Sequence, residues 1–417
     1  MEVFKFGGAS VKDADSVKNI LSVLQKKGVD NKLIVVSAMG KTTNALEKVI
    51  HAYFTHKNEL SEAIEVSHTY HFTILSGLFA SDHPIFETVQ TLFNNLQSFL
   101  ERNKSPNYDF VYDQVICYGE LIATKIISAF LSENHIKNTW IDARELIKTN
   151  TSYRDAHVDW ETTQKNIQSA IQKEGVFITQ GFIASEENNF TTTLGREGSD
   201  YTGAIFAYCL NADNLTIWKD VPGVLNGDPN VFKNTQLLKR ISYNEAIEMA
   251  FYGASVIHPK TLQPLQRKEI PLYVKSFVTP DNPGTFIGKG IALDPMIACY
   301  ILKKNQVLIS LSSIDFNFIM EAHISDIFNL LHRYKMKVTM MQNSAISFSV
   351  CVENKFNTLD ELLKKLRANY KVRWNEGVTL LTARHAKPSE TRQLLQGRKV
   401  LLKQENRTVT QYVLKEA

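Results

Sequence analysis

The segment 191–204 holds the most concentrated group of chemically useful residues in the chain. It is small, polar and interrupted by glycines, and an apolar run follows it, which is typical of a loop that leads into a helix. Arg196 stands here between Gly195 and Gly198. Its planar guanidinium suits a carboxylate, and the glycines let the backbone come close to a ligand. The segment therefore predicts a site for an acidic ligand.

Two residues of the same segment fit the start of a helix. Ser199 is predicted as the N-cap, and Asp200 falls in the first turn, where the helix dipole favours an acid. An ordinary capping loop would account for both residues, but it would not account for Arg196. Both interpretations stay open when the segment is considered alone.

A second group of candidates stands at the start of the chain. Residues 2–6 alternate and are rich in β-formers, so they predict a strand, and a helix is predicted at 13–27. Gly7 and Gly8 join the two elements, so their amides could meet an anion near Lys5, at the end of the strand. The plainer interpretation is a tight turn with a solvated lysine.

A similar loop follows the next predicted strand, 32–36. Ser37 and Thr43 place hydroxyl groups after the carboxyl end of this strand, which is where open α/β sheets bind ligands. The run that starts at Gly40 resembles part of a phosphate-binding P-loop. That motif needs a glycine five residues earlier, and Val35 occupies the position, so a P-loop is excluded.

Glu120 is an acid in an otherwise apolar helical stretch. The region before it, 45–102, has apolar residues at helical spacing and predicts core packing. Glu120 lies either on a surface turn or in a cleft, where it would bind a cation such as an ammonium group. The surface position is the default expectation, because carboxylates are rarely buried.

These loops need a scaffold that brings the strand ends together. Further strands are predicted at 138–141, 175–179, 215–219 and 271–277. Strands that alternate with helices imply an α/β fold with a mostly parallel sheet flanked by helices. The small polar loops are then expected to gather at one edge of the sheet. A turn-rich boundary closes this predicted domain, 1–290.

The pattern changes beyond about residue 298. Strands are predicted at 306–311, 337–341, 345–352 and 370–374, and helices at 323–334 and 359–368. This βαββαβ order predicts a small α+β domain, 298–376. Residues 377–417 are predicted to begin a second unit of the same kind, which is shortened.

The composition fits a globular protein of two or three domains. Lys and Arg total 47 against 43 Asp and Glu, a balance that argues against nucleic acid or a membrane as partner. No signal peptide is visible and no apolar run is judged long enough to span a bilayer, so a cytoplasmic location is expected. No cluster completes a metal site around His68 and His71. Buried free thiols are expected at Cys117, Cys209, Cys299 and Cys351.

A series of motifs occurs in the order found in aspartokinases of the amino acid kinase family. They are 5–11 (KFGGASV), 37–44 (SAMGKTTN), 119–120 (GE), 192–200 (TTLGREGSD), 219–223 (KDVPG), 228–229 (DP) and 253–259 (GASVIHP). The tail resembles an ACT regulatory domain. The sequence is therefore identified as a member of this family, and a monofunctional enzyme is expected because no homoserine dehydrogenase segment follows the tail.

The resemblance implies transfer of the ATP γ-phosphoryl group to the side-chain carboxylate of L-aspartate. The product is 4-phospho-L-aspartate, in the first step of lysine, threonine and methionine biosynthesis. Lys5 and Asp200 are the implied catalytic residues. The implied substrate site consists of Ser37, Thr43, Glu120, Arg196, Glu197, Gly198 and Ser199. The implied nucleotide site consists of Lys5, Gly7, Gly8, Ser10, Lys219, Asp220, Leu225, Asn230, Ser255 and Val256.

The same resemblance assigns roles and partners. Arg196 would clamp a substrate carboxylate, Glu120 and Thr43 would hold the rest of the amino acid, and Asp200 would orient Lys5. Mg²⁺ would be held mainly by the phosphates of ATP. An amino-acid effector such as lysine or threonine is expected at the ACT region, which would also join the chain into a homodimer or larger homo-oligomer.

The chain departs from the family pattern at five positions, three of which are on the nucleotide side. Relatives carry threonine, threonine, tyrosine, arginine and lysine where this chain has Ala9, Lys219, Leu225, Asn230 and Ser255. Two expected cations are thus lost and Lys219 is gained. One hypothesis is that Lys219 reaches phosphate or ribose and restores part of the charge. The alternative is that it points to solvent or pairs with Asp220.

Two other classes of function remain open. The lost cations would suit a catalytically inactive amino-acid sensor, although Lys5, Arg196 and Asp200 are present. The second class is a kinase acting on glutamate or a related acid. The motif at 192–200 and the ACT-like tail argue against this second class.

Overall fold

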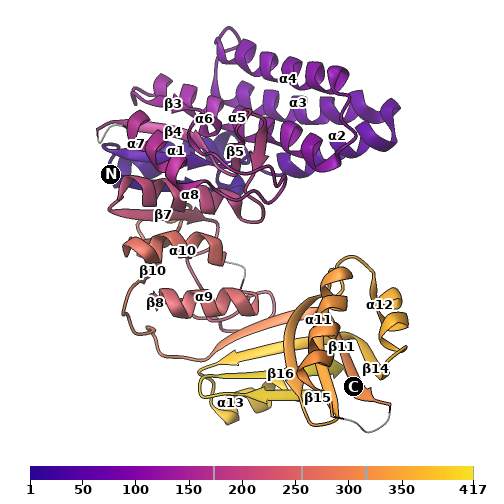
Figure 1. Ribbon diagram of the computed structural model, residues 1–417. Coiled ribbons are helices and arrows are strands. Elements are labelled where there is room, and N and C mark those ends of the chain that lie inside the picture. The colour runs from indigo at the N-terminus through magenta and orange to yellow at the C-terminus, as the bar shows by residue number, and fades with distance from the viewer. Residues whose placement is uncertain (172–173, 255–256, 315–317, 417) are drawn as a thin grey trace. The chain divides into compact units, whose positions relative to one another are not determined.

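The computed structural model describes residues 1–171, 174–254, 257–314 and 318–416. The chain forms two compact units (Figure 1). Unit 1 comprises Met1–Val224, Leu237–Ile247 and Ser255–Pro295. Unit 2 comprises Leu225–Gln236, Glu248–Ala254 and Met296–Ala417. Two short segments that precede the main boundary in the sequence therefore belong to unit 2.

Unit 1 is built on an eight-stranded sheet in the order β3-β4-β2-β1-β7-β9-β10-β8. β1 (Glu2–Phe6) lies between β2 (Lys32–Val36) and β7 (Asn214–Lys219). The other strands are β3 (Thr139–Ile141), β4 (Val176–Gln180), β8 (Arg240–Ser242), β9 (Leu272–Ser276) and β10 (Thr285–Gly288). Neighbouring strands are parallel except for β9 and β10, which confirms the predicted mostly parallel sheet.

Helices flank this sheet, as predicted (Figure 1). The helices of unit 1 are α1 (Ala14–Lys27), α2 (Thr42–Thr55), α3 (Leu60–Leu78), α4 (Ile85–Arg102), α5 (Tyr108–Glu133), α6 (Ala143–Leu146), α7 (Trp160–Ala170), α8 (Gly198–Leu210) and α10 (Pro259–Lys268), and α9 (Tyr243–Tyr252) is divided between the two units. In α4, Val89, Phe93 and Leu96 are buried at helical spacing, which confirms the expected core packing. An antiparallel hairpin of β5 (Ile183–Ser185) and β6 (Thr191–Thr193) was not predicted.

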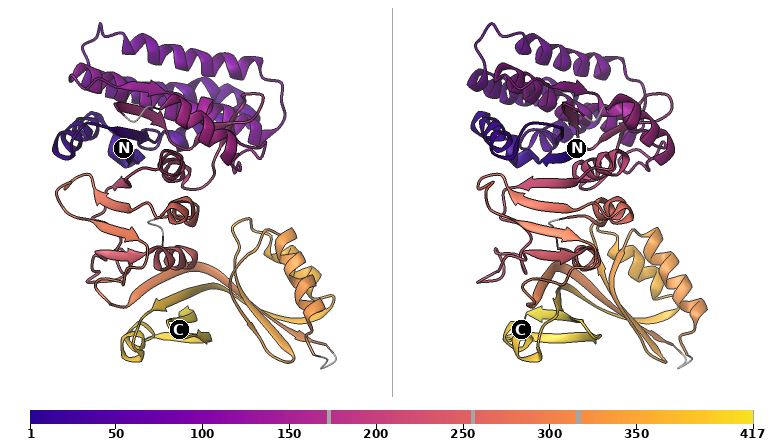
Figure 2. Two further views of the ribbon diagram at one scale, coloured as in Figure 1. Left: turned by 60° about the vertical axis from the view of Figure 1, so that its left-hand side comes forward. Right: turned by 90° about the vertical axis from the view of Figure 1, so that its left-hand side faces the viewer.

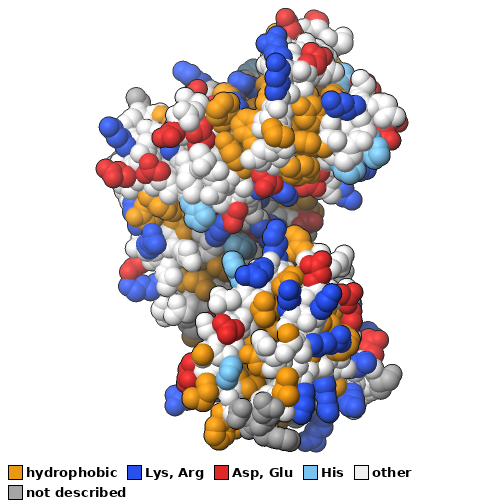
Figure 3. Space-filling view, turned by 45° about the vertical axis from the view of Figure 1, so that its right-hand side comes forward, with side chains coloured by type: hydrophobic (Ala, Val, Ile, Leu, Met, Phe, Trp, Pro, Cys, Tyr) orange, Lys and Arg blue, Asp and Glu red, His pale blue; other side chains and the backbone are white. Residues whose placement is uncertain are grey.

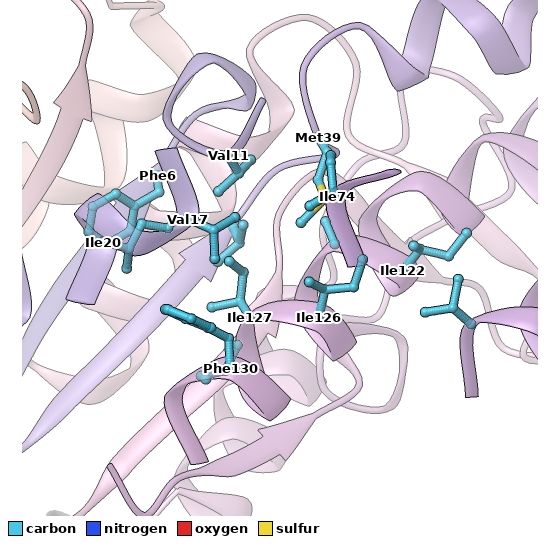
Figure 4. Close-up of a cluster of buried hydrophobic side chains, with 14 of the residues drawn as sticks. Phe6, Val11, Val17, Ile20, Met39, Ile74, Ile122, Ile126, Ile127 and Phe130 are labelled. Carbon is cyan, nitrogen blue, oxygen red and sulfur yellow. The ribbon is translucent and has the colours of Figure 1, made fainter. Parts of the chain in front are cut away.

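The core of unit 1 forms where α1 and α5 pack on the central strands. Phe6 of β1, Val17 of α1 and Ile126 and Ile127 of α5 belong to one buried cluster (Figure 4). α5 has the length and composition of a membrane span, so the expectation that no apolar run is long enough was wrong. Most of its apolar stretch is buried in this core, as in the central helix of a globular domain.

Unit 2 contains a six-stranded antiparallel sheet in the order β12-β13-β11-β14-β16-β15. Its strands are β11 (Cys299–Ser313), β12 (Lys337–Asn343), β13 (Ser347–Glu353), β14 (Tyr370–Arg384), β15 (Arg398–Glu405) and β16 (Val409–Glu416). Its other helices are α11 (Glu321–Arg333), α12 (Leu359–Leu366) and α13 (Pro388–Leu394). α11 and α12 pack on one face of the sheet through residues such as Ile327 and Leu362 (Figure 2). The predicted βαββαβ order is confirmed.

One strand of unit 2 differs from the prediction. β14 runs without a break through Gly377, where the sequence placed the start of a second unit. Gly377 has a φ of 67°, and the pairing with β11 shifts register between Lys303 and Leu308. Gly377 therefore lies at an irregularity inside one long strand instead of at a boundary between two units. The existence of a second ACT-like unit stays a prediction.

The surface carries both signs of charge. Basic and acidic side chains are interspersed over the face shown in Figure 3. This distribution agrees with the formal net charge of only +4. The four cysteines are free and buried, as expected.

Candidate active site

A pocket of about 280 Å³ opens in unit 1 where β1 and β2 end and α8 begins. The side chains and backbone around it are Lys5, Gly8, Ser37, Ala38, Gly40, Thr43, Glu120, Phe182, Gly195, Glu197, Gly198, Ser199 and Asp200. Phe6 lies beside Val36 in the parallel register, so the loops after β1 and β2 leave the sheet at the same edge. The structure thus brings together predicted residues that are far apart in the sequence.

Asp200 is the most enclosed charge at this pocket. Its side chain is fully buried, with Oδ1 2.5 Å from Nζ of Lys5 and Oδ2 3.2 Å from Nζ of Lys219. Burial alone would raise the pKa of Asp200, but the two ammonium groups together hold this pKa below its usual value. Asp200 is therefore an ionised carboxylate at neutral pH.

The position of Lys219 corrects one expectation from the sequence. Lys219 pairs with Asp200, and its side chain is only 19% exposed, so it does not point into solvent. Asp220 itself is exposed. The physical reason is that β7 lies beside β1, so the end of β7 delivers Lys219 to the first turn of α8.

Glu120 lies on a buried part of α5, so the expectation that it occupies a surface turn was wrong. The residue is 2% exposed, and its Oε2 has no hydrogen-bond partner among the residues that the structure describes. Burial raises the pKa of Glu120 to about 8. A Cβ atom on Gly119 would lie 3.0 Å from Cβ of Ala38, so α5 packs closely on the loop after β2. A buried carboxyl oxygen without a partner suits a cationic ligand group.

The loops after β1 and β2 pack closely against each other. A Cβ atom on Gly8 would lie 2.9 Å from the carbonyl oxygens of both Ala38 and Gly40, so only glycine fits there. The amide of Gly40 donates to the carbonyl of Gly8 over 3.0 Å. Ser10 is buried, and its hydroxyl lies 3.4 Å from the carbonyl oxygen of Trp218. Gly7, between strand and loop, is half-buried.

The start of α8 corrects the predicted cap. The helix begins at Gly198, and the residue before it, Glu197, has a φ of 55° and occupies the cap position. Ser199 therefore lies inside the first turn, and the N-cap prediction was wrong. A Cβ atom on Gly198 would lie 2.6 Å from Cδ2 of Phe182, so this ring forces glycine at the first helical position. Arg196 is exposed and lies outside the pocket lining.

The remaining predicted nucleotide residues are Leu225, Asn230, Ser255 and Val256. Leu225 and Asn230 belong to unit 2, where the Asn230 amide donates to Oδ1 of Asp228 over 3.0 Å. Ser255 and Val256 lie outside the described residues. Their proposed roles stay predictions.

Asp113 is a buried acid of α5 that the sequence analysis missed. It is fully buried in α5 and accepts hydrogen bonds from the amide and hydroxyl of Thr193 and from the amide of Arg154. Burial raises the pKa of Asp113 to about 6. Asp113 precedes Glu120 by seven residues, two helical turns, and this spacing of acids in an apolar helix was the available signal.

Within the described parts of the chain, no three His, Cys, Asp or Glu side chains gather closely enough to hold a metal ion. Asp200 is occupied by two ammonium groups, and Glu120 has a pKa of about 8, so both are poor ligands for Mg²⁺. This donor set fits an ion carried by a nucleotide better than one held by the protein alone.

The sequence and the fold of this chain are both similar to those of known proteins. Residues 1–276 match the model of the amino acid kinase family. Lysine-sensitive aspartokinase 3 of Escherichia coli is 32% identical over 391 residues, which cover 91% of this chain and 86% of the relative.

Two solved structures of E. coli aspartokinase III are similar over 99% of this chain. One is the complex with aspartate and ADP, called the R-state, with a TM-score of 0.84, 28% identity and 96% of its own chain covered. The other is the complex with lysine and aspartate, called the T-state, with a TM-score of 0.81, 28% identity and 95% covered. This chain belongs to the amino acid kinase family and, within it, to the aspartokinases.

Proposed function

We propose that the chain is an ATP-dependent aspartate kinase that phosphorylates the side-chain carboxylate of L-aspartate and releases 4-phospho-L-aspartate and ADP. The observation that carries this proposal is the ionised Asp200 between Lys5 and Lys219, at a pocket that is also lined by Glu120, whose Oε2 has no partner among the described residues. Phosphoryl transfer requires mainly positioning and neutralisation of charge, and this arrangement offers both.

The acidic and basic groups of the pocket suit an amino acid with two carboxylates. Glu120 would hold the α-ammonium group, and the hydroxyls of Ser37 and Thr43 would hydrogen-bond the substrate. Arg196 stands on the loop whose neighbours Gly195 and Glu197 line the pocket, from which its long side chain would reach the α-carboxylate. Lys5 would then face the side-chain carboxylate and the transferring phosphoryl group.

ATP would approach from the ends of β1 and β7. The amides of Gly7 and Gly8 and the turn at Asp220 would contact the nucleotide, with Leu225, Asn230, Ser255 and Val256 as further expected contacts. Mg²⁺ would neutralise phosphate charge when bound with ATP. No residue of the chain needs to become a covalent intermediate in this reaction.

The regulatory proposals rest on the relatives. The E. coli enzyme is named lysine-sensitive and was solved with lysine, so we expect lysine, or alternatively threonine, as an effector at the ACT-like region of unit 2. We also expect a homo-oligomer formed through residues after about 298, a cytoplasmic location, and a role at the first step of lysine, threonine and methionine biosynthesis.

A coupled assay of ADP release, combined with hydroxylamine trapping, tests the activity. Hydroxylamine displaces phosphate from an acyl phosphate and leaves a hydroxamate, so a hydroxamate formed only with aspartate and ATP identifies the acceptor. The Lys5→Ala variant is the matched control and should lose both signals. ADP binding without turnover would indicate an inactive sensor, and turnover with glutamate alone would indicate a different amino acid kinase.

A further inference from the structure

The charge balance around Asp200 is unusual for an ion pair. One buried carboxylate contacts two ammonium groups, so the cluster of Lys5, Asp200 and Lys219 carries a net charge of one positive unit. All three side chains are largely shielded, with exposures of 8%, 0% and 19%. Electrostatic effects are stronger in such a shielded place than in water.

The two lysines reach Asp200 from neighbouring strands. Lys5 on β1 lies beside Ile217 on β7, so Lys219 stands two residues further toward the carboxyl edge, on the same face of the sheet. Lys5 contacts Oδ1 and lines the pocket, whereas Lys219 contacts Oδ2 and is absent from the lining. Lys219 therefore holds the carboxylate without occupying the substrate space.

The second lysine changes how much of the positive charge of Lys5 is compensated by Asp200. If Lys5 were the only cation on Asp200, the pair would be neutral and most of the Lys5 charge would be compensated by its partner. Because Lys219 shares the carboxylate, the cluster keeps a surplus positive charge, and Lys5 is the member that faces the pocket. Positive charge placed where phosphoryl oxygens develop charge is worth most in the transition state.

We propose that Lys219 is a positioning residue for phosphoryl transfer: it shares Asp200 with Lys5 and thereby leaves the Lys5 ammonium charge available to the transferring phosphoryl group. This inference rests on the proposed kinase activity. In that step an aspartate carboxylate oxygen forms a bond to the γ-phosphorus. The bond from this phosphorus to the bridging oxygen breaks, and ADP leaves with the electron pair. Lys219 exchanges no proton.

The experiment compares three substitutions at one position. Lys219→Met keeps the length of the side chain without its charge, Lys219→Thr removes both, and Lys219→Arg keeps the charge. We expect kcat to fall about tenfold in the Met and Thr variants, less than the loss of a directly contacting group. The KM for ATP should change less than about twofold. The Arg variant should retain most of the activity.

The pH dependence separates a positioning role from a structural one. Removing one cation raises the pKa of Asp200, so the acidic limb of the kcat profile should move to higher pH in Lys219→Met and return in Lys219→Arg. Thermal denaturation against pH gives a second readout, because the acidic pH below which stability falls should move in the same direction.

Three outcomes would overturn the proposal. If folded Lys219→Met had an unchanged kcat and pH profile, the charge of Lys219 would have no role in phosphoryl transfer. A change confined to the KM for ATP would mean that Lys219 binds phosphate directly. An equal decrease in kcat in the Lys219→Arg and Lys219→Met variants would mean that only the packing of the side chain matters. Failure of the wild-type chain to phosphorylate aspartate would instead refute the kinase assignment, while the denaturation experiment would still test the Lys219–Asp200 pair.

Discussion

Glu120 titrates in the range in which the enzyme would work. Its pKa of about 8 is raised by burial, so without ligand the side chain is mostly protonated at pH 7. Only the carboxylate form attracts an ammonium group strongly, so binding of aspartate at pH 7 should release a proton.

The apparent KM for aspartate should therefore fall as the pH rises from about 6.5 toward 8, by up to about tenfold per pH unit. Glu120→Gln should bind aspartate weakly with little pH dependence across this range. Steady-state kinetics at each pH, with calorimetry in buffers of different ionisation enthalpy, measures both the KM and the released proton. A flat profile in the wild type would contradict the proposed ammonium contact.

Arg196 provides a test of substrate recognition that is independent of folding. Its side chain is exposed, so Arg196→Lys should leave the melting temperature unchanged. The lysine keeps the charge but loses the planar fork, so we expect the KM for aspartate to rise about tenfold or more while the KM for ATP changes little. Equal changes in both constants would show that Arg196 does not read the amino acid.

The sequence predicted which residues belong to the site better than it predicted the orientation of their side chains. Lys5, Asp200 and Glu120 were found because loops after parallel strands meet at one edge and because acids in apolar stretches are rare. The inward orientation of Glu120 depends on the close packing at Gly119, and the cap at Glu197 depends on the Phe182 ring. Both are contacts between distant segments, which periodicity and spacing do not report.

At the scale of elements, α5 connects the pocket to the loop before α8. It carries Glu120 at the pocket and Asp113 two turns earlier, and Asp113 holds Thr193 at the end of β6. β6 leads directly into the 194–197 loop that lines the pocket. One buried helix thus fixes both a substrate group and a segment of the binding loop.

Asp113 supports a prediction about stability. Its pKa rises from 3.8 to about 6 in the folded chain, so the folded state binds the proton more tightly and stability falls as the pH rises between these values. Asn has the shape of the protonated acid, so Asp113→Asn should be at least as stable as wild type at pH 7.5 and should lose this pH trend. Asp113→Ala should cost about 1–3 kcal/mol through unsatisfied donors.

Chemical denaturation from pH 4 to pH 8 measures these differences, with Asp82→Asn, at an exposed aspartate of unit 1, as the control. A large loss of stability in Asp113→Asn at pH 7.5 would show that the charge itself is needed. The mostly parallel sheet of unit 1 was accessible from the sequence pattern. The hydrogen bond between α5 and β6 was not, because the β5–β6 hairpin is short and rich in threonine.

At the scale of the whole molecule, unit 2 has unpaired edges and exposed apolar side chains. β12 and β15 form the edges of its sheet. Phe318, Met320 and Met341 are each more than half exposed. Sheet edges and apolar patches of this kind usually need a partner. We expect at least a dimer through this region.

Light scattering over a range of concentrations tests this expectation. Phe318→Asp and Met341→Asp should shift the equilibrium toward monomer, whereas Val66→Asp, at an exposed apolar residue of unit 1, should leave it unchanged. A wild-type chain that is monomeric at working concentration would contradict the prediction.

The discontinuous course of the chain limits how the protein can be dissected. Unit 2 includes Leu225–Gln236 and Glu248–Ala254, and both segments depend on residues after Pro295. The Asn226 side chain donates to the carbonyl of Ala298 over 2.9 Å, and Glu248 pairs with Arg384 over 3.0 Å. A deletion after Pro295 would leave these two insertions without their partners. Unit 2 is therefore not a removable module, and a chimera that exchanged it between relatives would have to include both insertions.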